Sequence, residues 1–339
     1  MVVLTFKLLD CTLRDGGYIN SWNFAQCQIS STIENLTNAG IEYVELGYLT
    51  SVLNAVGGSR FYSVESASQF IPKDRRASKY LIMADVSQFD ADSLCERKDS
   101  TLDGIRVVFY KRQVEEAFAF CEKVTKKGYD LFLQPMVTID YTFCEFQKLI
   151  ERFYARYPLY AVSIVDSFGC MDFENIEQFI RVLEQTLDEG IKIGFHAHNN
   201  MQLSLTNAIS LTNYKSKYDF VIDASVGGMG RGAGNLSTEL IANYTNKVHN
   251  KRYELNFIMK IMSEVVEPLS KKEKWGYSSF FFLTAMRQAH PNFASYLLGS
   301  HEISVLDFYE YMKLVPDDML TKCTRPYVEE MYEKFVGSK

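Results

Sequence analysis

The chain lacks several features that mark whole classes of protein. It contains no run of about 18 consecutive apolar residues, the length that a membrane-spanning helix requires. Basic residues do not predominate: 42 Asp and Glu against 36 Lys and Arg give a formal net charge of −6 at pH 7. A nucleic-acid-binding protein needs a basic face. We therefore expect no membrane span and no nucleic acid among the partners.

The cysteines lack the spacing of a metal-binding or redox motif. The 339 residues include seven cysteines, an odd number, and no Cys-x-x-Cys pair. The first residues also lack the apolar region of a signal peptide. Because disulfide frameworks belong mainly to secreted chains, these observations favour reduced thiols and a cytoplasmic protein.

Short apolar segments alternate with amphipathic ones along the first 250 residues. Apolar residues recur at helical spacing in Val114–Lys127 and Phe173–Glu189, for example. Eight other segments read as strands, namely Phe6–Leu13, Tyr43–Leu49, Lys79–Val86, Gly104–Tyr110, Asp130–Val137, Ala161–Phe168, Lys192–Asn199 and Phe220–Val226. Eight βα units in about 245 residues predict an α/β fold, the (β/α)8 TIM barrel. An open doubly wound sheet would normally show fewer strands and a glycine fingerprint after the first one, which is absent.

The alternation stops near residue 250. Four segments then have helical periodicity, Leu255–Leu269, Ser279–Ala289, Ser304–Lys313 and Arg325–Phe335, and no strand pattern returns. We predict a TIM-barrel catalytic domain at 1–250 and a helical C-terminal extension at 251–339. Aromatic residues concentrate after residue 275, which favours a packed helical cap or a subunit interface, and we expect a homo-oligomer.

Histidine is scarce, yet two of the five histidines lie together at His196 and His198. In a strand these side chains share one face, about 6–7 Å apart, so both imidazoles can reach one divalent cation. Two ordinary polar residues at a strand end are the alternative. Asp15, in the loop after the first strand, can supply an oxygen ligand. Its neighbour Arg14 would then stabilise a developing enolate oxygen.

Polar residues also recur where a TIM barrel builds its active site, at inward positions near the strand ends. If the alternation continues through the first strand, Asp10, Thr12 and Arg14 face inward with Leu8, whereas Leu9 faces the helices. The other strands contribute Glu45, Gly47, Arg106, Tyr110, Gln134, Asp166, His196, His198 and Asp223. Burying so many polar groups costs several kcal/mol unless they pair or bind a ligand. We expect internal salt bridges, such as Arg106 with Glu45 or Asp223, around a small polar substrate.

The loop after the eighth strand, Gly227–Asn235, has five glycines in its first eight residues. At this end of a barrel such a loop predicts a mobile lid or a loop that contacts an oxyanion. Arg231 within it is either a ligand for an anionic substrate group or a solvated charge.

Several of these segments resemble the motifs of the DRE-TIM metallolyase superfamily. The resemblance rests on Asp10–Gly16, Phe195–Asn199 and Gly227–Asn235. That group includes 4-hydroxy-2-oxovalerate aldolase, HMG-CoA lyase, and the isopropylmalate and homocitrate synthases. Asp166–Gly169 and Trp275–Ser278 place the chain nearest to the 4-hydroxy-2-oxovalerate aldolases.

The resemblance implies a divalent-metal-dependent aldolase that uses Mn²⁺ or Mg²⁺. Such a carbon–carbon lyase acts on a 4-hydroxy-2-oxo acid through a pyruvate enolate, so its small-molecule partners are a 2-oxo acid and an aldehyde. An acylating aldehyde dehydrogenase is the implied protein partner. The implied metal-site residues are Asp15, His196, His198 and Asn235. The implied catalytic residue is Arg14. The substrate contacts that the resemblance implies are Arg14, Ser167, His196 and Tyr277. We add Glu45 and Gln134 to the predicted substrate contacts because they belong to the inward-facing polar residues described above.

One departure concerns the base. The aldolases carry a catalytic histidine in the slot that Tyr18 occupies here, and a phenol with an unperturbed pKa of about 10 is a poorer base near pH 7. Either Tyr18 is the catalytic group that transfers the proton, or another group or a metal-bound water does so, or the substrate differs.

Three rival functions stay open. A Claisen-type synthase that condenses an acyl-CoA with a 2-oxo acid commonly has Glu-Gln where this chain has Gly17-Tyr18. An enzyme like HMG-CoA lyase would carry a cysteine in the glycine-rich loop, which has none. A non-catalytic barrel that binds metal and a 2-oxo acid is the rival from another class.

Overall fold

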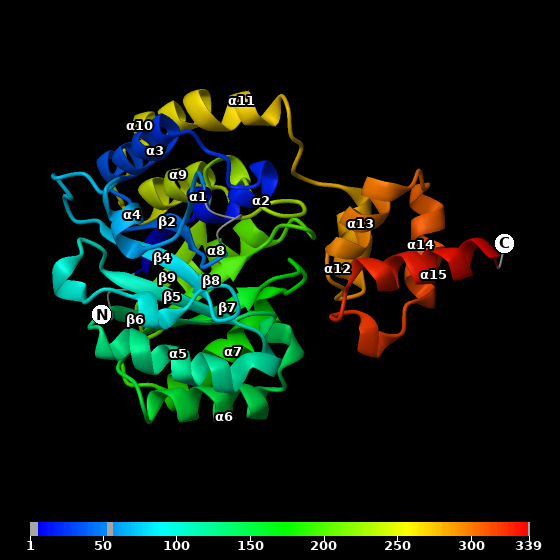
Figure 1. Ribbon diagram of the computed structural model, residues 1–339, viewed down its shortest axis with the longest axis horizontal. Helices are drawn as coiled ribbons and strands as arrows, with labels where there is room; N and C mark the ends of the chain where they lie inside the picture. Colours follow the sequence, from blue (N-terminus) through cyan, green and yellow to red (C-terminus); the bar gives the residue numbers. More distant parts are fainter. Residues whose placement is uncertain (1–5, 53–56, 338–339) are drawn as a thin grey trace.

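The computed structural model describes residues 6–52 and 57–337, and within them eight parallel strands close into a barrel (Figure 1). The strands run around the barrel in the order β1, β2, β4, β5, β6, β7, β8 and β9, and β1 pairs with both β2 and β9. Their bounds are β1 Phe6–Asp10, β2 Tyr43–Leu49, β4 Lys79–Asp85, β5 Gly104–Phe109, β6 Asp130–Pro135, β7 Leu159–Asp166, β8 Lys192–Ala197 and β9 Phe220–Ala224. A short strand β3, Arg60–Phe61, extends the sheet beside β2. The predicted TIM barrel is confirmed.

Helices surround this barrel and bury one face each against the strands. They are α3 Gln26–Ala39, α4 Val64–Ser68, α5 Val114–Lys126, α6 Phe143–Tyr154, α7 Phe173–Thr186, α8 Ser204–Asn213 and α9 Thr238–Val248. In α6, for example, Phe146, Ile150 and Phe153 are buried at helical spacing. This helix begins with a capping box, in which Thr142 and Glu145 satisfy each other's backbone N–H groups.

The barrel interior is apolar at the end where the strands begin and polar at the end where they finish. The apolar layer consists of Leu9, Cys11, Tyr43, Leu81, Phe132, Ala161 and Val221. A larger hydrophobic core lies between the strands and the helices and includes Leu8 and the buried face of α3. The interior therefore leaves only the mouth of the barrel for polar chemistry.

The prediction for the first strand is wrong both in its length and in the direction of its side chains. The strand ends there because the Asp10 carboxylate accepts the backbone N–H of Thr12 at 2.9 Å, and the chain turns into the short helix α1, Thr12–Asp15. Leu9 faces the barrel interior and Leu8 packs with the helices, the reverse of the predicted arrangement. Arg14 and Asp15 thus reach the mouth from a helical turn.

The chain beyond the barrel forms two groups of helices. Helix α10, Leu255–Ile261, continues through a π-helical turn at Met262–Val266 into α11, Glu267–Ser270, and packs along α3 (Figure 1). The second group is α12 Ser279–Met286, α13 Asn292–Ser300, α14 Val305–Leu314 and α15 Arg325–Gly337, with a hydrophobic core of its own. The helical extension is confirmed, and the domain boundary at residue 250 stays a prediction.

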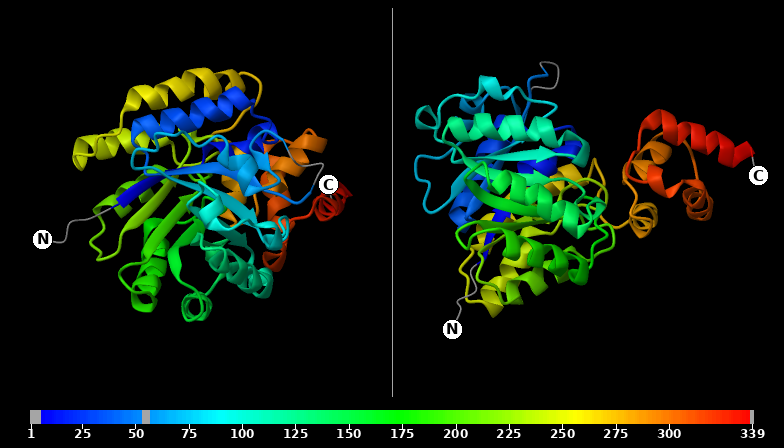
Figure 2. Two further views of the ribbon diagram at one scale, coloured as in Figure 1. Left: turned by 60° about the vertical axis from the view of Figure 1, so that its left-hand side comes forward. Right: turned by 90° about the horizontal axis from the view of Figure 1, so that it is seen from below.

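The α12–α15 group lies at the end of the barrel toward which the strands point (Figure 2). The ring of Phe168, in the loop after β7, meets His290 of this group edge-on, with 5.6 Å between the ring centroids. The helical group therefore borders the barrel mouth. Within the part of the chain that is described, no helix has both the length and the apolar character needed to cross a membrane.

Candidate metal and substrate site

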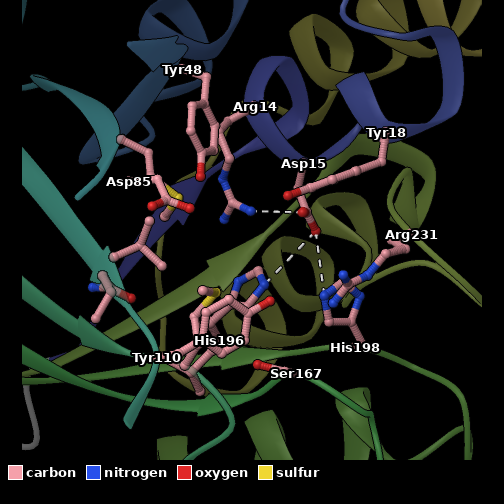
Figure 3. Close-up of a pocket in the computed structure, with 15 residues that line it drawn as sticks. Arg14, Asp15, Tyr18, Tyr48, Asp85, Tyr110, Ser167, His196, His198 and Arg231 are labelled. Carbon is pink, nitrogen blue, oxygen red and sulfur yellow. Dashed lines mark hydrogen bonds and ion pairs between the residues drawn. The ribbon is translucent and has the colours of Figure 1, made fainter. Parts of the chain in front are cut away.

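Three potential metal ligands converge at the barrel mouth (Figure 3). Asp15 comes from α1, His196 from the end of β8, and His198 from the residues that follow β8. The Oδ2 atom of Asp15 lies 3.8 Å from Nε2 of His196 and 3.9 Å from Nε2 of His198. Two atoms can bind one cation only if they lie closer than twice the bond length, about 4.2 Å for bonds of about 2.1 Å. Both distances meet that condition.

The environment of His196 sets the orientation of its ring. Its Nδ1 atom lies 3.1 Å from Oδ2 of Asp223, and a carboxylate there favours the tautomer with the proton on Nδ1. The lone pair on Nε2 then faces Asp15. Burial would raise the pKa of Asp223, but the charge of Arg106 lowers it, so this carboxylate is ionised.

The other two ligands are also in the protonation states that bind metal. Burial lowers the pKa of His198 to about 3, so its imidazole is neutral near pH 7. Burial would raise the pKa of Asp15, but the charge of Arg14, with smaller contributions from the two histidines, holds it well below its usual range. A carboxylate and two imidazole groups form a donor set that suits a divalent cation.

Asn235 adjoins this set. Its side-chain nitrogen donates to Oδ2 of Asp15, while its buried Oδ1 atom has no hydrogen-bond partner among the described residues. An unpaired buried acceptor is costly, and a cation would satisfy it. The donor atoms around Asp15 therefore fit a divalent metal, with Asn235 as a fourth candidate ligand.

Buried ion pairs join the ligands into a ring around the barrel interior. Arg14 binds Asp15 at 2.6 Å and Glu45 at 2.8 Å. Arg106 binds Glu45 at 3.0 Å and also pairs with Asp223. The predicted pairing of Arg106 with Glu45 or Asp223 is confirmed, because it pairs with both. Every charged side chain in this ring contacts oppositely charged groups, or one such group and a histidine. These contacts fix the side chains before any ligand binds.

A pocket opens above this ring (Figure 3). Its walls are formed by Arg14, Asp15, Tyr18, Tyr48, Met83, Asp85, Val108, Tyr110, Gln134, Met136, Val165, Ser167, His196, His198 and Arg231. Glu45 lies beneath the pocket, where it holds the two arginines. Gln134 lines it while accepting from Arg106 at 3.2 Å and donating to Ser163 at 2.6 Å. Ser167 lines it and accepts the N–H of Val137 at 3.0 Å.

Two predicted residues lie elsewhere. Asp166 was predicted to face inward, which is wrong: its carboxylate accepts the N–H groups of Cys170 and Met171 at 3.0 and 3.1 Å and caps the turn before α7. The alternate positions of β7, such as Ser163, point inward instead. Tyr277 is 63% exposed in the linker before α12 and does not line the pocket, so its role in substrate binding stays a prediction.

Sequence reasoning missed Tyr48 and Asp85. A β-bulge in β2 between Glu45 and Tyr48 interrupts strict alternation, so Tyr48 faces the pocket where alternation would place Gly47. Gly47, which has a positive φ at the bulge, is the signal that could have marked it, because a glycine inside a strand often indicates a bulge. Asp85 could have been found, because it follows Leu81 at an even spacing along β4 and so shares its inward face.

Tyr18 and the glycine-rich loop close one side of the pocket. The guanidinium of Arg231 lies over the Tyr18 ring, 5.5 Å from its centroid. Tyr18 is 42% exposed as a residue, but it also lines the pocket, where desolvation raises the pKa of its phenol and the nearby charge of Arg231 only partly opposes this. The loop is held in place because Trp275 donates to the carbonyl of Gly227 at 3.0 Å and Asn199 donates to that of Gly234 at 2.8 Å.

Comparisons with known proteins agree with this geometry. The HMGL-like family model matches residues 105–265. The 4-hydroxy-2-oxovalerate aldolase of Chloroflexus aurantiacus is 26% identical over 272 residues, which cover 78% of this chain and 76% of that protein. An oxaloacetate decarboxylase of Mycobacterium tuberculosis is 25% identical over 74% of this chain and 73% of its own length.

A solved structure extends the similarity to the fold. The N-terminal domain of a putative aldolase from Bacteroides vulgatus matches with a TM-score of 0.75 at 25% identity, covering 87% of this chain and 97% of that one. Together with the closed barrel and its Asp-His-His group, these matches bear out the predicted resemblance to the DRE-TIM metallolyase superfamily.

Proposed function

We propose that this enzyme is a divalent-metal-dependent aldolase that acts on a 4-hydroxy-2-oxo acid. In the cleavage direction the 4-hydroxyl loses its proton, the C3–C4 bond breaks, and C4 becomes the carbonyl carbon of an aldehyde. The electron pair passes to the pyruvate enolate, which is then protonated at C3. The observation that carries this proposal is the convergence of Asp15, His196 and His198 beside Arg14 in one pocket.

The residues around the ligands support enolate chemistry. When bound by Asp15 and the two histidines, a divalent cation supplies Lewis-acid polarisation of the 2-oxo group. Arg14 is fixed through Nε by Glu45 and through Nη1 by Asp15. Its Nη2 atom can then donate to an oxygen that gains negative charge, and a donor that is already oriented needs no rearrangement as the charge develops.

Tyr18 is the residue that we propose for proton transfer to and from the 4-oxygen. Its raised pKa keeps the phenol protonated near pH 7. In the direction of aldol addition, the phenol can therefore donate its proton to the aldehyde oxygen as the C–C bond forms. Cleavage needs the phenolate and should become faster as the pH rises.

Composition, donor chemistry and the family resemblance support further assignments. The mixed nitrogen and oxygen donors support Mn²⁺ or Mg²⁺ as the cation. Composition supports a cytoplasmic location, and the aromatic residues beyond residue 275 support a homo-oligomer. An acylating aldehyde dehydrogenase as a partner rests on the resemblance to the 4-hydroxy-2-oxovalerate aldolases.

Proton exchange of pyruvate tests the central step. Protein freed of metal with EDTA and reloaded with Mn²⁺ or Mg²⁺ should exchange the methyl protons of pyruvate in D₂O, and the metal-free protein should not. We expect His198→Ala to abolish exchange. The matched control is His301→Ala, a histidine in the α12–α15 group that contacts Glu329. Absence of exchange with either metal would contradict the aldolase proposal, and release of free thiol from acetyl-CoA would favour the synthase.

Decarboxylation of oxaloacetate is a second candidate because one of the relatives is an oxaloacetate decarboxylase. It passes through the same enolate but releases CO₂ instead of an aldehyde. Measurement of CO₂ from oxaloacetate, beside aldehyde from 4-hydroxy-2-oxo acids, separates the two.

A further inference from the structure

We propose that the aldehyde half of the substrate carries an anionic group, a carboxylate or a phosphate, and that Arg231 binds it. This inference rests on the proposed aldolase function and names the class of acceptor aldehyde that the site would take.

Arg231 differs from the other arginines of the site in having no acidic partner. Arg14 and Arg106 each contact two carboxylates, whereas no ion pair joins Arg231 to any acidic residue in the described part of the chain. Its Nε atom is buried and lacks a hydrogen-bond partner there. Burial of an unsatisfied charged donor is costly, so an anionic ligand at this position would recover that cost.

The charges of the site indicate that the anion is not the carboxylate of pyruvate. Two arginines in the ring face three carboxylates, Asp15, Glu45 and Asp223. These five side chains carry a net charge of −1, and a divalent cation together with the single carboxylate of one 2-oxo acid would bring the total to zero. The positive charge of Arg231 then remains without a counter-charge.

Asp85 is the other carboxylate that lines the pocket, and it does not balance Arg231 by contact. It accepts hydrogen bonds from the backbone N–H and the hydroxyl of Ser87 at 2.7 and 2.6 Å. In Figure 3 it lies beside Tyr48, across the pocket from Arg231. A substrate group near Arg231 therefore meets an uncompensated positive charge.

The position of Arg231 relates the anion to the reacting oxygen. The guanidinium lies over the ring of Tyr18, the residue proposed for proton transfer. An anion bound there sits at the acceptor end of the pocket. The hydrogen bonds that anchor the loop at Gly227 and Gly234 hold Arg231 in this place.

Pairs of aldehydes that differ in charge test the proposal. With pyruvate and Mn²⁺, kcat/KM would be measured for succinic semialdehyde against butanal, and for glycolaldehyde phosphate against glycolaldehyde. These two pairs separate a carboxylate from a phosphate. Charge-assisted hydrogen bonds contribute about 1.5–3 kcal/mol, so we expect the anionic member of at least one pair to be favoured about 10–150-fold. Arg231→Met should abolish this ratio, and Arg231→Lys should retain part of it.

The outcomes are distinguishable from failure of the aldolase proposal. If the wild-type protein exchanges the methyl protons of pyruvate but uses both members of each pair equally, the aldolase stands and the role of Arg231 is overturned. If Arg231→Met raises the KM for pyruvate and leaves the acceptor ratio unchanged, Arg231 binds pyruvate and the inference is also overturned. Binding of 4-hydroxybutyrate against 1-butanol, followed by NMR in metal-free protein, gives a readout without turnover. If 4-hydroxybutyrate and 1-butanol bind equally weakly to the wild-type protein, the result would count against the anion site.

Discussion

Replacement of Asp223 by Asn should weaken metal binding although Asp223 is not a proposed ligand. Its carboxylate lies 3.1 Å from Nδ1 of His196 and keeps the proton on that atom. An amide of the same size can turn its NH₂ group toward Nδ1 and stabilise the opposite tautomer, in which the Nε2 that faces Asp15 carries the proton. Loss of a carboxylate that orients a ligating histidine lowers metal affinity about 10–100-fold, or about 1.4–2.7 kcal/mol.

The same substitution also affects stability, and the structure bounds that effect. Removal of one partner from a buried ion pair costs about 3–5 kcal/mol. Arg106 keeps its contact with Glu45 at 3.0 Å, so we expect a loss near the lower end of that range. The matched control is Asp103→Asn. Asp103 also bridges two arginines, Arg75 and Arg97, but in a partly exposed position before β5. We expect it to cost about 1 kcal/mol or less and to leave metal affinity unchanged.

Two measurements separate these effects. Titration of EDTA-treated protein with Mn²⁺, followed by the EPR signal of the free ion, gives the affinity. Urea unfolding followed by circular dichroism gives the stability. If Asp223→Asn remains folded and binds Mn²⁺ within about twofold of the wild type, then the tautomer of His196 does not depend on Asp223 and the reasoning is refuted.

Three further predictions concern single side chains. His198→Ala should abolish Mn²⁺ binding in the same titration while the circular dichroism spectrum stays unchanged, and unaltered affinity would remove it from the ligand set. Tyr18→His should make cleavage level off above about pH 6.5, the ordinary pKa of histidine, whereas the wild-type rate should keep rising with pH because burial raises the pKa of Tyr18. Burial lowers the pKa of His290 to about 3, so below pH 6.5 the unfolded state binds a proton that the folded state excludes. As the pH falls from 6.5 to 3, the free energy of unfolding of the wild type, measured in urea, should therefore decrease relative to that of His290→Gln by up to about 1.4 kcal/mol per pH unit. A difference between the two proteins that does not change with pH would contradict this.

The fold could be predicted from sequence because its signal repeats. Each strand contributes an apolar segment of similar length, and an error of a few residues at one end does not change the alternation with helices. Single interactions decided the places where prediction failed. The hydrogen bond from Thr12 to Asp10 ends β1 early, and the bulge before Tyr48 shifts β2 by one position. Helix α13 was not predicted because only Phe293, Ala294 and Leu297 are buried in it.

The candidate ligands could be predicted for a different reason. His196 lies near the end of β8 and His198 follows directly after it, so the extended chain places both rings at the mouth whatever the register of its neighbours. Arg231 could not be placed from sequence, because a glycine-rich loop has no preferred path of its own. Its path follows from contacts with residues distant in the chain, such as the hydrogen bond from Trp275 to Gly227.

The metal site also depends on closure of the barrel. Asp15 follows β1, His196 lies near the end of β8 and His198 follows that strand; β1 and β8 are joined by β9, which pairs with both. An open sheet would separate the carboxylate from the imidazoles. A cation bound at this site therefore stabilises the closed barrel relative to every state in which β1 has detached. At a free concentration of 100 times Kd that stabilisation amounts to about 2.7 kcal/mol. Because the ligands come from opposite ends of the barrel sequence, this free energy should appear in the global unfolding of the barrel.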